Sequence, residues 1–155
     1  MIVSNTTTFD VVALLQSSVA DFPTDGLTVE VKYCPSNSRR YASGTYYRRT
    51  RNYENGKLIR VRINRKNRYP ISIRFKTSEY FKKRNRKGED MVYQKLRSVK
   101  FQKAEDVILG IFLHEFSHYM DHMEGRNGRY KQTKADKFAV SILEQMGVIE
   151  TVRPS

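Results

Sequence analysis

The chain has 155 residues, of which 39% are hydrophobic, enough for one core but not for two, so we expect a single domain over residues 1–155. It carries 29 Lys and Arg against 16 Asp and Glu, a formal net charge of +13 at pH 7. This balance excludes an acidic solvating protein and is compatible with a polyanionic partner.

Three segments in the first 64 residues show regular apolar spacing. A helix is expected over residues 8–20, with Thr8 as its N-cap, because apolar residues recur there at helical intervals. Residues 27–33 alternate apolar and polar side chains, which predicts a half-buried strand. Residues 42–50 and 57–64 are expected to form the arms of an antiparallel hairpin, because Asn55-Gly56 between them favours a tight turn.

The middle of the chain is expected to add one more strand and a short helix. Ile71, Ile73 and Phe75 alternate with polar residues, which predicts the strand. The basic run at residues 82–87 is expected to be an exposed loop. Residues 90–99 are expected to form the short helix, whose inward side chains are Met91, Val92 and Leu96.

Two further helices are expected in the C-terminal part. The first covers residues 104–124, with Glu105 and Asp106 favouring the dipole at its start, and it ends at Gly125. The second covers residues 133–146 and ends at Gly147. The order of elements predicts an α+β fold with an N-terminal helix, a small antiparallel sheet and two C-terminal helices.

All three histidines lie in the first of these C-terminal helices. His114 and His118 are four residues apart, so their imidazoles project from one face, close enough to bind one metal ion together. Glu115 leans over the same edge, where it can take a proton from a metal-bound water. This His-Glu-x-x-His arrangement predicts His114 and His118 as zinc ligands and Glu115 as the catalytic base. The alternative is a partly exposed helix in which these histidines are ordinary polar residues.

Residues 114–118, His-Glu-Phe-Ser-His, resemble the active-site motif of the zincin metallopeptidases. Residues 135–139, Ala-Asp-Lys-Phe-Ala, resemble the stretch that follows the active-site helix in gluzincins, including the ImmA/IrrE-like group. Residues 44–49 and 59–64 are similar to the strands before the catalytic helix in SprT-like proteins. The resemblance implies a zincin-like fold and zinc-dependent hydrolysis of peptide bonds in a protein or peptide substrate. It covers residues 104–146, and the first hundred residues match in architecture only.

The third metal ligand departs from the gluzincin pattern, because Gln132 stands where those proteins usually offer a glutamate. His122 is not favoured, since on an unbroken helix it lies about 12 Å along the axis from His114. Asp136 is the expected third ligand, because a chain reversal after the histidine helix can aim its carboxylate at the metal. Two alternatives stay open for this residue: it orients a histidine, as the matching Asp does in gluzincins, or it caps a helix with Thr133.

Zincins commonly use a Tyr, His or Arg near the metal to stabilise the oxyanion. Tyr119 and Tyr130 are the candidates here, although most of the 10 tyrosines must be packing residues. A second class of function stays open beside the peptidase. In this alternative the chain is a non-catalytic nucleic-acid-binding protein that keeps a degenerate zincin fold.

The positive charge is concentrated in the middle of the chain. Residues 39–103 hold 22 Lys and Arg but only 4 acids, a local net charge of +18, whereas the rest of the chain has a net charge of −5. Alternating cations on strands suit a solvated sheet face and a phosphate-binding surface about equally. We therefore expect segment 39–103 to be a candidate surface for DNA or RNA, bound with little sequence preference.

The compartment follows from three absences in the sequence. The single cysteine, Cys34, cannot form an internal disulfide, and residues 1–8 lack the features of a secretory signal. Every apolar run is much shorter than the roughly 20 residues that are needed to span a bilayer. We expect a cytoplasmic protein with no membrane partner.

Overall fold

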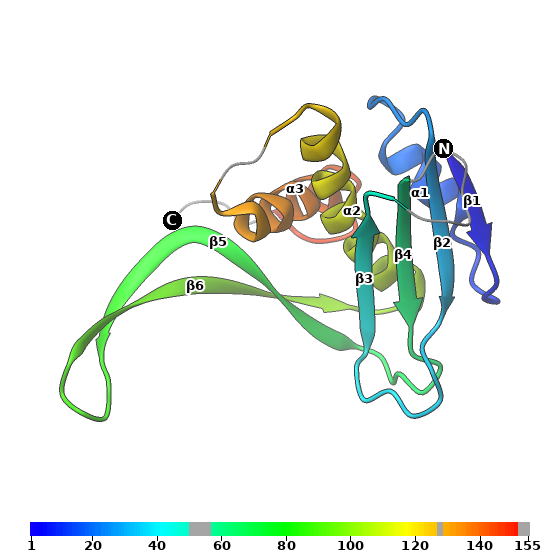
Figure 1. The fold of residues 1–155 in the computed structure, drawn as a ribbon. Coiled ribbons are helices and arrows are strands. Elements are labelled where there is room, and N and C mark those ends of the chain that lie inside the picture. The colour runs from blue at the N-terminus through cyan, green and yellow to red at the C-terminus, as the bar shows by residue number, and fades with distance from the viewer. Residues whose placement is uncertain (50–56, 127–128, 152–155) are drawn as a thin grey trace.

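The computed structural model describes residues 1–49, 57–126 and 129–151, and it has mixed α+β architecture (Figure 1). This confirms the predicted class. In chain order the elements are β1 (Ile2–Asn5), α1 (Val12–Ser18), β2 (Leu27–Tyr33), β3 (Ala42–Tyr47), β4 (Lys57–Ile63), β5 (Ile71–Arg84), β6 (Asp90–Phe101), α2 (Ala104–Met123) and α3 (Lys131–Gln145). Among the described residues, no helix has both the length and the apolar character needed to cross a bilayer.

Four strands form a mixed sheet in the order β1-β2-β4-β3. β1 pairs parallel with β2, and β2 pairs parallel with β4, so the expectation of an antiparallel sheet is wrong. The cause is β1, a four-residue strand that sequence periodicity does not reveal, together with the insertion of β4 between β2 and β3. The expected hairpin is confirmed as the antiparallel pair β3 and β4, while its turn lies outside the described residues.

The N-terminal helix is shorter than predicted, covering Val12–Ser18 instead of residues 8–20. Thr8 does not cap it, because the residue before the helix is Val11 and the Thr8 hydroxyl lies 2.9 Å from the hydroxyl of Tyr33. The backbone N–H of Thr8 also donates to Tyr33. The threonine therefore ties the loop before α1 to the end of β2.

β5 and β6 form a separate two-stranded antiparallel ribbon that curves away from the rest of the molecule beneath α3 (Figure 1). The expected helix over residues 90–99 is therefore wrong, and Val92, expected to point inward, is 62% exposed. Pairing with β5 overrides the helix-like spacing of the apolar residues. β5 also continues to Arg84, so only the end of the basic run lies in the loop.

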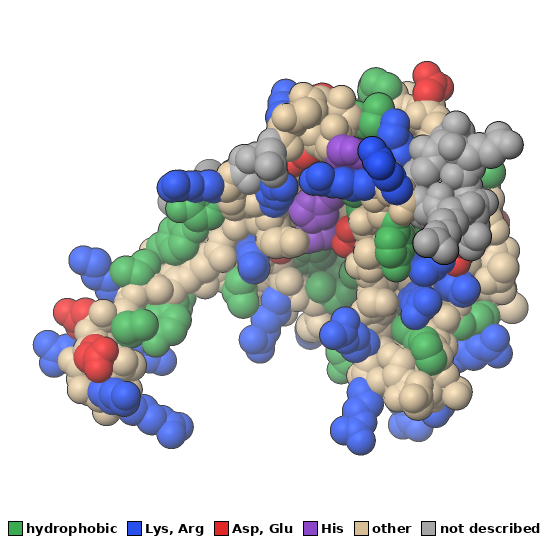
Figure 2. All heavy atoms as spheres, viewed as in Figure 1, with side chains coloured by type: hydrophobic (Ala, Val, Ile, Leu, Met, Phe, Trp, Pro, Cys, Tyr) green, Lys and Arg blue, Asp and Glu red, His purple; other side chains and the backbone are tan. Residues whose placement is uncertain are grey.

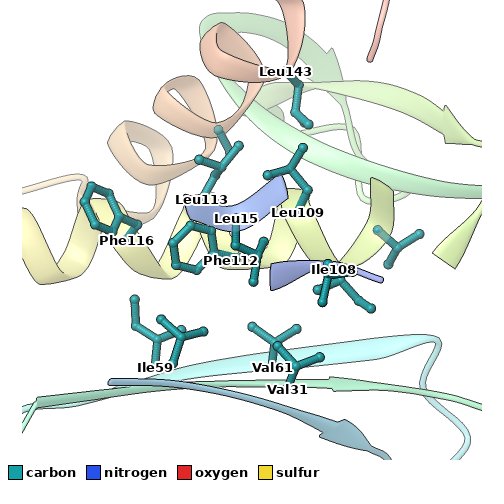
Figure 3. Close-up of a cluster of buried hydrophobic side chains, with 14 of the residues drawn as sticks. Leu15, Val31, Ile59, Val61, Ile108, Leu109, Phe112, Leu113, Phe116 and Leu143 are labelled. Carbon is teal, nitrogen blue, oxygen red and sulfur yellow. The ribbon is translucent and has the colours of Figure 1, made fainter. Parts of the chain in front are cut away.

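α2 is the central layer, packed against β3 and β4 on one side and against α3 on the other (Figure 3). The two turns from Val107 to Leu113 are apolar on all sides, which is typical of a helix buried in a core. The buried side chains include Ile108, Leu109, Phe112, Leu113 and Phe116. They meet Val31, Ile59 and Val61 of the sheet, Leu15 of α1 and Leu143 of α3.

Both C-terminal helices end where the sequence predicts. Gly125 and Gly147 follow α2 and α3 with φ of 68° and 71°, values that glycine adopts without a steric penalty. α3 begins at Lys131, two residues before the predicted start. Thr133 therefore lies inside the first turn and is not an N-cap, so the capping-box interpretation of Thr133 and Asp136 is wrong.

Core and ribbon side chains differ in burial, so truncating them should lower the free energy of unfolding by different amounts. Leu109→Ala should lower the free energy of unfolding by about 2–5 kcal/mol, because it opens a cavity beside a fully buried helix. Val92→Ala should change the same quantity by less than about 0.5 kcal/mol, because the side chain is mostly solvated. Denaturant unfolding of both variants checks this, and a large loss in Val92→Ala would contradict the exposed ribbon.

Candidate metal centre

The imidazoles of His114 and His118 face each other one turn apart on α2. Their Nε2 atoms are 3.3 Å apart and the ring centroids 5.0 Å apart. Two nitrogen ligands at the usual zinc distance in a tetrahedral site lie about 3.3–3.4 Å from each other. The structure thus brings the two sequence-predicted histidines together with the spacing that one zinc ion requires.

Asp136 holds the far side of the first imidazole. Its Oδ1 atom lies 2.6 Å from Nδ1 of His114, and its Oδ2 atom accepts a hydrogen bond of 2.7 Å from the backbone N–H of Lys76 in β5. Because a carboxylate accepts, Nδ1 carries the proton when the imidazole is neutral, which leaves the lone pair on Nε2. The two oxygens of Asp136 face Nδ1 of His114 and the ribbon. The expectation that Asp136 is itself a metal ligand stays a prediction.

Gln132 occupies the side of the pair nearest α3. Its Oε1 atom is 2.8 Å from Nε2 of His114, and its side chain also hydrogen-bonds His118. Among the described residues there is no group of three or more His, Cys, Asp or Glu arranged to hold a metal ion. The third polar atom facing the two imidazoles is therefore an amide oxygen.

The two histidines have opposite electrostatic environments. Burial lowers the pKa of His114, but the hydrogen bond and charge of Asp136, with smaller help from Glu115 and Gln132, outweigh it and raise the pKa overall. Burial lowers the pKa of His118, and the neighbouring charge of His114 lowers it further. Of the two imidazoles, that of His118 is therefore the one more readily neutral.

Glu115 is held between α2 and the edge strand β3. Burial raises the pKa of its carboxyl, while the charge of His114 and a hydrogen bond from the backbone N–H of Tyr46 oppose the rise. This contact requires a very close approach of strand and helix at Gly44. A Cβ atom on Gly44 would lie 2.5 Å from Cγ2 of Ile111 and 3.0 Å from Cγ of Glu115.

A tyrosine and a histidine far apart in sequence form a second polar pair beside Glu115. The hydroxyl of Tyr46 lies 2.6 Å from Nδ1 of His122. Burial raises the pKa of Tyr46 to about 12, and burial followed by the charges of Arg48, Lys57 and Arg49 lowers the pKa of His122. Tyr46 therefore donates to a neutral imidazole, whose proton sits on Nε2.

One pocket of about 390 Å³ lies between β3 and the C-terminal half of α2. Its lining includes Tyr46, Glu115, His118, His122 and Gln132, whereas His114 and Asp136 are not part of the lining. Histidine side chains reach the surface in a region that Lys and Arg side chains surround (Figure 2). The arrangement combines imidazole nitrogens, a half-buried carboxylate and a hydroxyl–imidazole pair in one solvent-accessible space.

The two tyrosines suggested by the sequence do not line this pocket. Tyr119 is 2% exposed, and its hydroxyl donates to the backbone oxygen of Asp25. Tyr130 is 72% exposed and lines a different depression, beside Tyr80. The residues that sequence reasoning missed are Tyr46 and His122, which come together across 76 positions. His122 can be noticed in the sequence as the third histidine of the helix, but its pairing with Tyr46 depends on the position of β3.

Comparison of this chain with protein-family models, with curated proteins and with solved structures finds no match. The class of protein therefore has to be argued from the site itself.

The close approach at Gly44 predicts a large effect of a single methyl group. Gly44→Ala should lower the free energy of unfolding by about 1–3 kcal/mol, because the new Cβ collides with Ile111 and pushes β3 away from Glu115. Ser43→Ala, on the neighbouring residue of β3, is the control and should cost less. Denaturant unfolding measures both.

A double-mutant cycle tests the cause of that loss. Ile111→Ala removes the Cγ2 atom in the collision, so it should cost less in the Gly44→Ala background than alone. Strict additivity of the two substitutions would show that the strand and helix are not in contact there.

Proposed function

We propose that the chain is a zinc-dependent metallopeptidase of the zincin type. The observation that carries the proposal is the pair of Nε2 atoms 3.3 Å apart, with Nδ1 of His114 bound by a carboxylate. Histidines that ligate metals usually donate their other ring N–H to such a partner, which fixes tautomer and orientation. The resemblance of residues 114–118 to the zincin motif supports the same class.

The residues present fit zinc by the chemistry of their donors. His114 and His118 offer two imidazole nitrogens, and the amide oxygen of Gln132 is the third atom beside them. Three protein donors with one open position are typical of catalytic zinc sites, although an amide is a weaker ligand than a carboxylate. Bound there, zinc would supply a Lewis acid that polarises a carbonyl and acidifies a water.

Glu115 is the general base in this proposal. Its carboxylate takes a proton from the attacking water and returns it to the leaving amine, and its raised pKa brings it closer to the pH at which proton transfer is efficient in both directions. The Tyr46 N–H holds the carboxylate against β3, so its position does not depend on the substrate. The base therefore stays beside the histidines throughout the cycle.

The substrate is expected to lie along β3. β3 is an edge strand of the sheet, and an extended peptide can add to such an edge through backbone hydrogen bonds. A peptide placed there passes Glu115 and the Tyr46–His122 pair, which line the same pocket. We assign stabilisation of the developing oxyanion to this pair, through the proton on Nε2 of His122, instead of to Tyr119 or Tyr130.

Asp136 is better suited to orienting His114 than to binding metal. Both of its oxygens are engaged, one on Nδ1 of His114 and the other on the Lys76 amide. Turning it toward the metal would break both hydrogen bonds and leave two partly buried N–H groups without their acceptor. We therefore propose the orienting role for Asp136, which is one of the two alternatives to metal binding that the sequence left open.

The competing class is a nucleic-acid-binding protein with a degenerate zincin fold. The two classes differ in one requirement, because only the peptidase needs zinc in stoichiometric amount and the Glu115 carboxylate. The peptidase is favoured by the 3.3 Å spacing of the two Nε2 atoms and by Glu115 beside His118, whereas the amide of Gln132 in place of a carboxylate is the feature that favours the degenerate alternative.

A first experiment tests the metal and the base together. The purified chain should contain about one zinc ion, and the double variant His114→Ala/His118→Ala should contain none at micromolar zinc. Glu115→Gln should keep zinc and thermal stability but hydrolyse a peptide library at least about 10² times more slowly. Metal analysis and mass spectrometry of the products provide the readouts. Full zinc content in the double variant, or unchanged cleavage by Glu115→Gln, would refute the proposal.

A second experiment separates the two roles of Asp136. Asp136→Ala should weaken zinc binding about 10–100-fold, the usual effect of losing a partner behind a ligand. Asp136→Asn should lose less, because its amide oxygen still accepts from Nδ1. Glu144→Ala is the control, since it removes another α3 carboxylate, one that pairs with Arg97. A loss far beyond 100-fold in Asp136→Ala would mean that Asp136 is a direct ligand.

A further inference from the structure

The outer half of the β5–β6 ribbon has no core of its own. At the root, Ile71, Phe75, Val99 and Phe101 are buried against the body. Beyond Lys76 nearly every side chain of both strands is exposed, and the pairing continues to Arg84 and Asp90. Figure 1 shows the far end of this part, around the turn between β5 and β6, standing clear of the helices and of the other sheet. We call residues 80–94 the arm.

The arm presents apolar side chains to solvent. Six of them, on the arm or just beside it, are between 39% and 62% exposed: Tyr80, Phe81, Met91, Val92, Tyr93 and Leu96. The rings of Phe81 and Tyr93 stack across the two strands with centroids 5.7 Å apart. Exposed apolar side chains gathered on one hairpin mark an interaction site, because folding alone gives no reason to retain them.

The arm is also rich in cations that have no carboxylate partner. Arg84 pairs with Asp90, but four others make no ion pair within the described part of the chain. We call these four the tip cations: Lys82, Lys83, Arg86 and Lys87. Figure 2 shows Lys and Arg side chains spreading from the end of the arm in several directions. Such a cluster is complementary to a polyanion.

The register of the ribbon distributes both kinds of side chain over both of its faces. Phe81 pairs with Tyr93 and Lys83 with Met91 on one face, whereas Lys82 pairs with Val92 on the other. A membrane-surface element needs one apolar face and one charged face, and the arm lacks this division. A partner that surrounds the arm from both sides suits it better.

The major groove of B-form DNA is such a partner. It is about 12 Å wide and admits a two-stranded ribbon, with phosphates along both walls. The deep, narrow major groove of A-form RNA does not admit one. We propose that the arm binds duplex DNA by entering the major groove, where the tip cations contact phosphates on both sides and the apolar side chains contact the groove surface.

This binding is largely independent of base sequence. The arm holds two amide side chains. Gln94 already donates to the backbone oxygen of Thr77 and to the hydroxyl of Thr133, and the Oδ1 atom of Asn85 accepts from the backbone N–H groups of Lys87 and Glu89. The proposal stands apart from the peptidase proposal, because it uses none of the pocket residues. Either can fail without the other.

The test is the salt dependence of binding to a 20-base-pair duplex DNA of random sequence, measured by fluorescence anisotropy with the full chain. Each phosphate contact contributes about −0.9 to the slope of log K against log salt concentration. Changing the tip cations to Gln should therefore make the slope shallower by about 3.6 and weaken binding at least tenfold at about 50 mM salt. Thermal unfolding should stay as in the wild type, since the arm lies outside the core.

The matched control removes four cations from the body. Arg39, Arg40, Arg68 and Lys103 are exposed, and changing them to Gln leaves the same net charge as in the tip variant. The control should bind DNA with a slope within about one of the wild type. Equal losses in the two variants would overturn the arm proposal, because they would show that binding follows net charge alone. Absence of wild-type binding at about 50 mM salt would overturn it as well.

Competition identifies the partner. Unlabelled duplex DNA should displace the probe more effectively than duplex RNA of the same length, and vesicles of phosphatidylserine and phosphatidylcholine should displace it least. Displacement by RNA equal to that by DNA would overturn entry into the major groove. Stronger displacement by vesicles would reassign the arm to membranes. Phe81→Ala/Tyr93→Ala should weaken binding severalfold with an unchanged salt slope, because it removes contact area without removing charge.

Discussion

The burial of α2 between the sheet and α3 is the constraint on which the rest of the structure depends. A helix that is apolar on nearly all sides gains stability from both neighbours, so its position is fixed within narrow limits. The same rigid helix then carries His114, Glu115 and His118 into a partly buried edge. Polar groups in such a place must find partners, and those partners are what define the site.

The partners come from three different elements, and each constrains its own part of the site. β3 gives a backbone N–H to Glu115, α3 gives a carboxylate to His114, and β5 gives an N–H to that carboxylate. Two of these partners are main-chain N–H donors, whose positions are set by strand register instead of by side-chain rotamers. The site is thus organised in advance of any ligand, as the proposed proton transfer by Glu115 requires.

The elements that were predicted correctly from the sequence are those with a strong local periodicity. β2, the β3–β4 hairpin and the two C-terminal helices each have a strong apolar repeat or a clear terminator, and the three central site residues lie within a single turn of one helix. The failures have a common origin in contacts between distant segments. β1 has four residues and no distinctive pattern, and residues 90–99 form a strand only because β5 pairs with them. The Tyr46–His122 pair and the Lys76–Asp136 bond span 76 and 60 positions.

The hydrogen bond from the Lys76 amide to Asp136 couples the position of the ribbon to the position of His114. A single carboxylate separates the strand from the imidazole, with 2.7 Å on one side and 2.6 Å on the other. The donor lies immediately before the irregularity that interrupts the pairing of β5 with β6 between Lys76 and Tyr80. A sideways force on the free end of the ribbon would therefore act mainly at this irregularity. The irregularity is next to the hydrogen bond that supports His114 through Asp136.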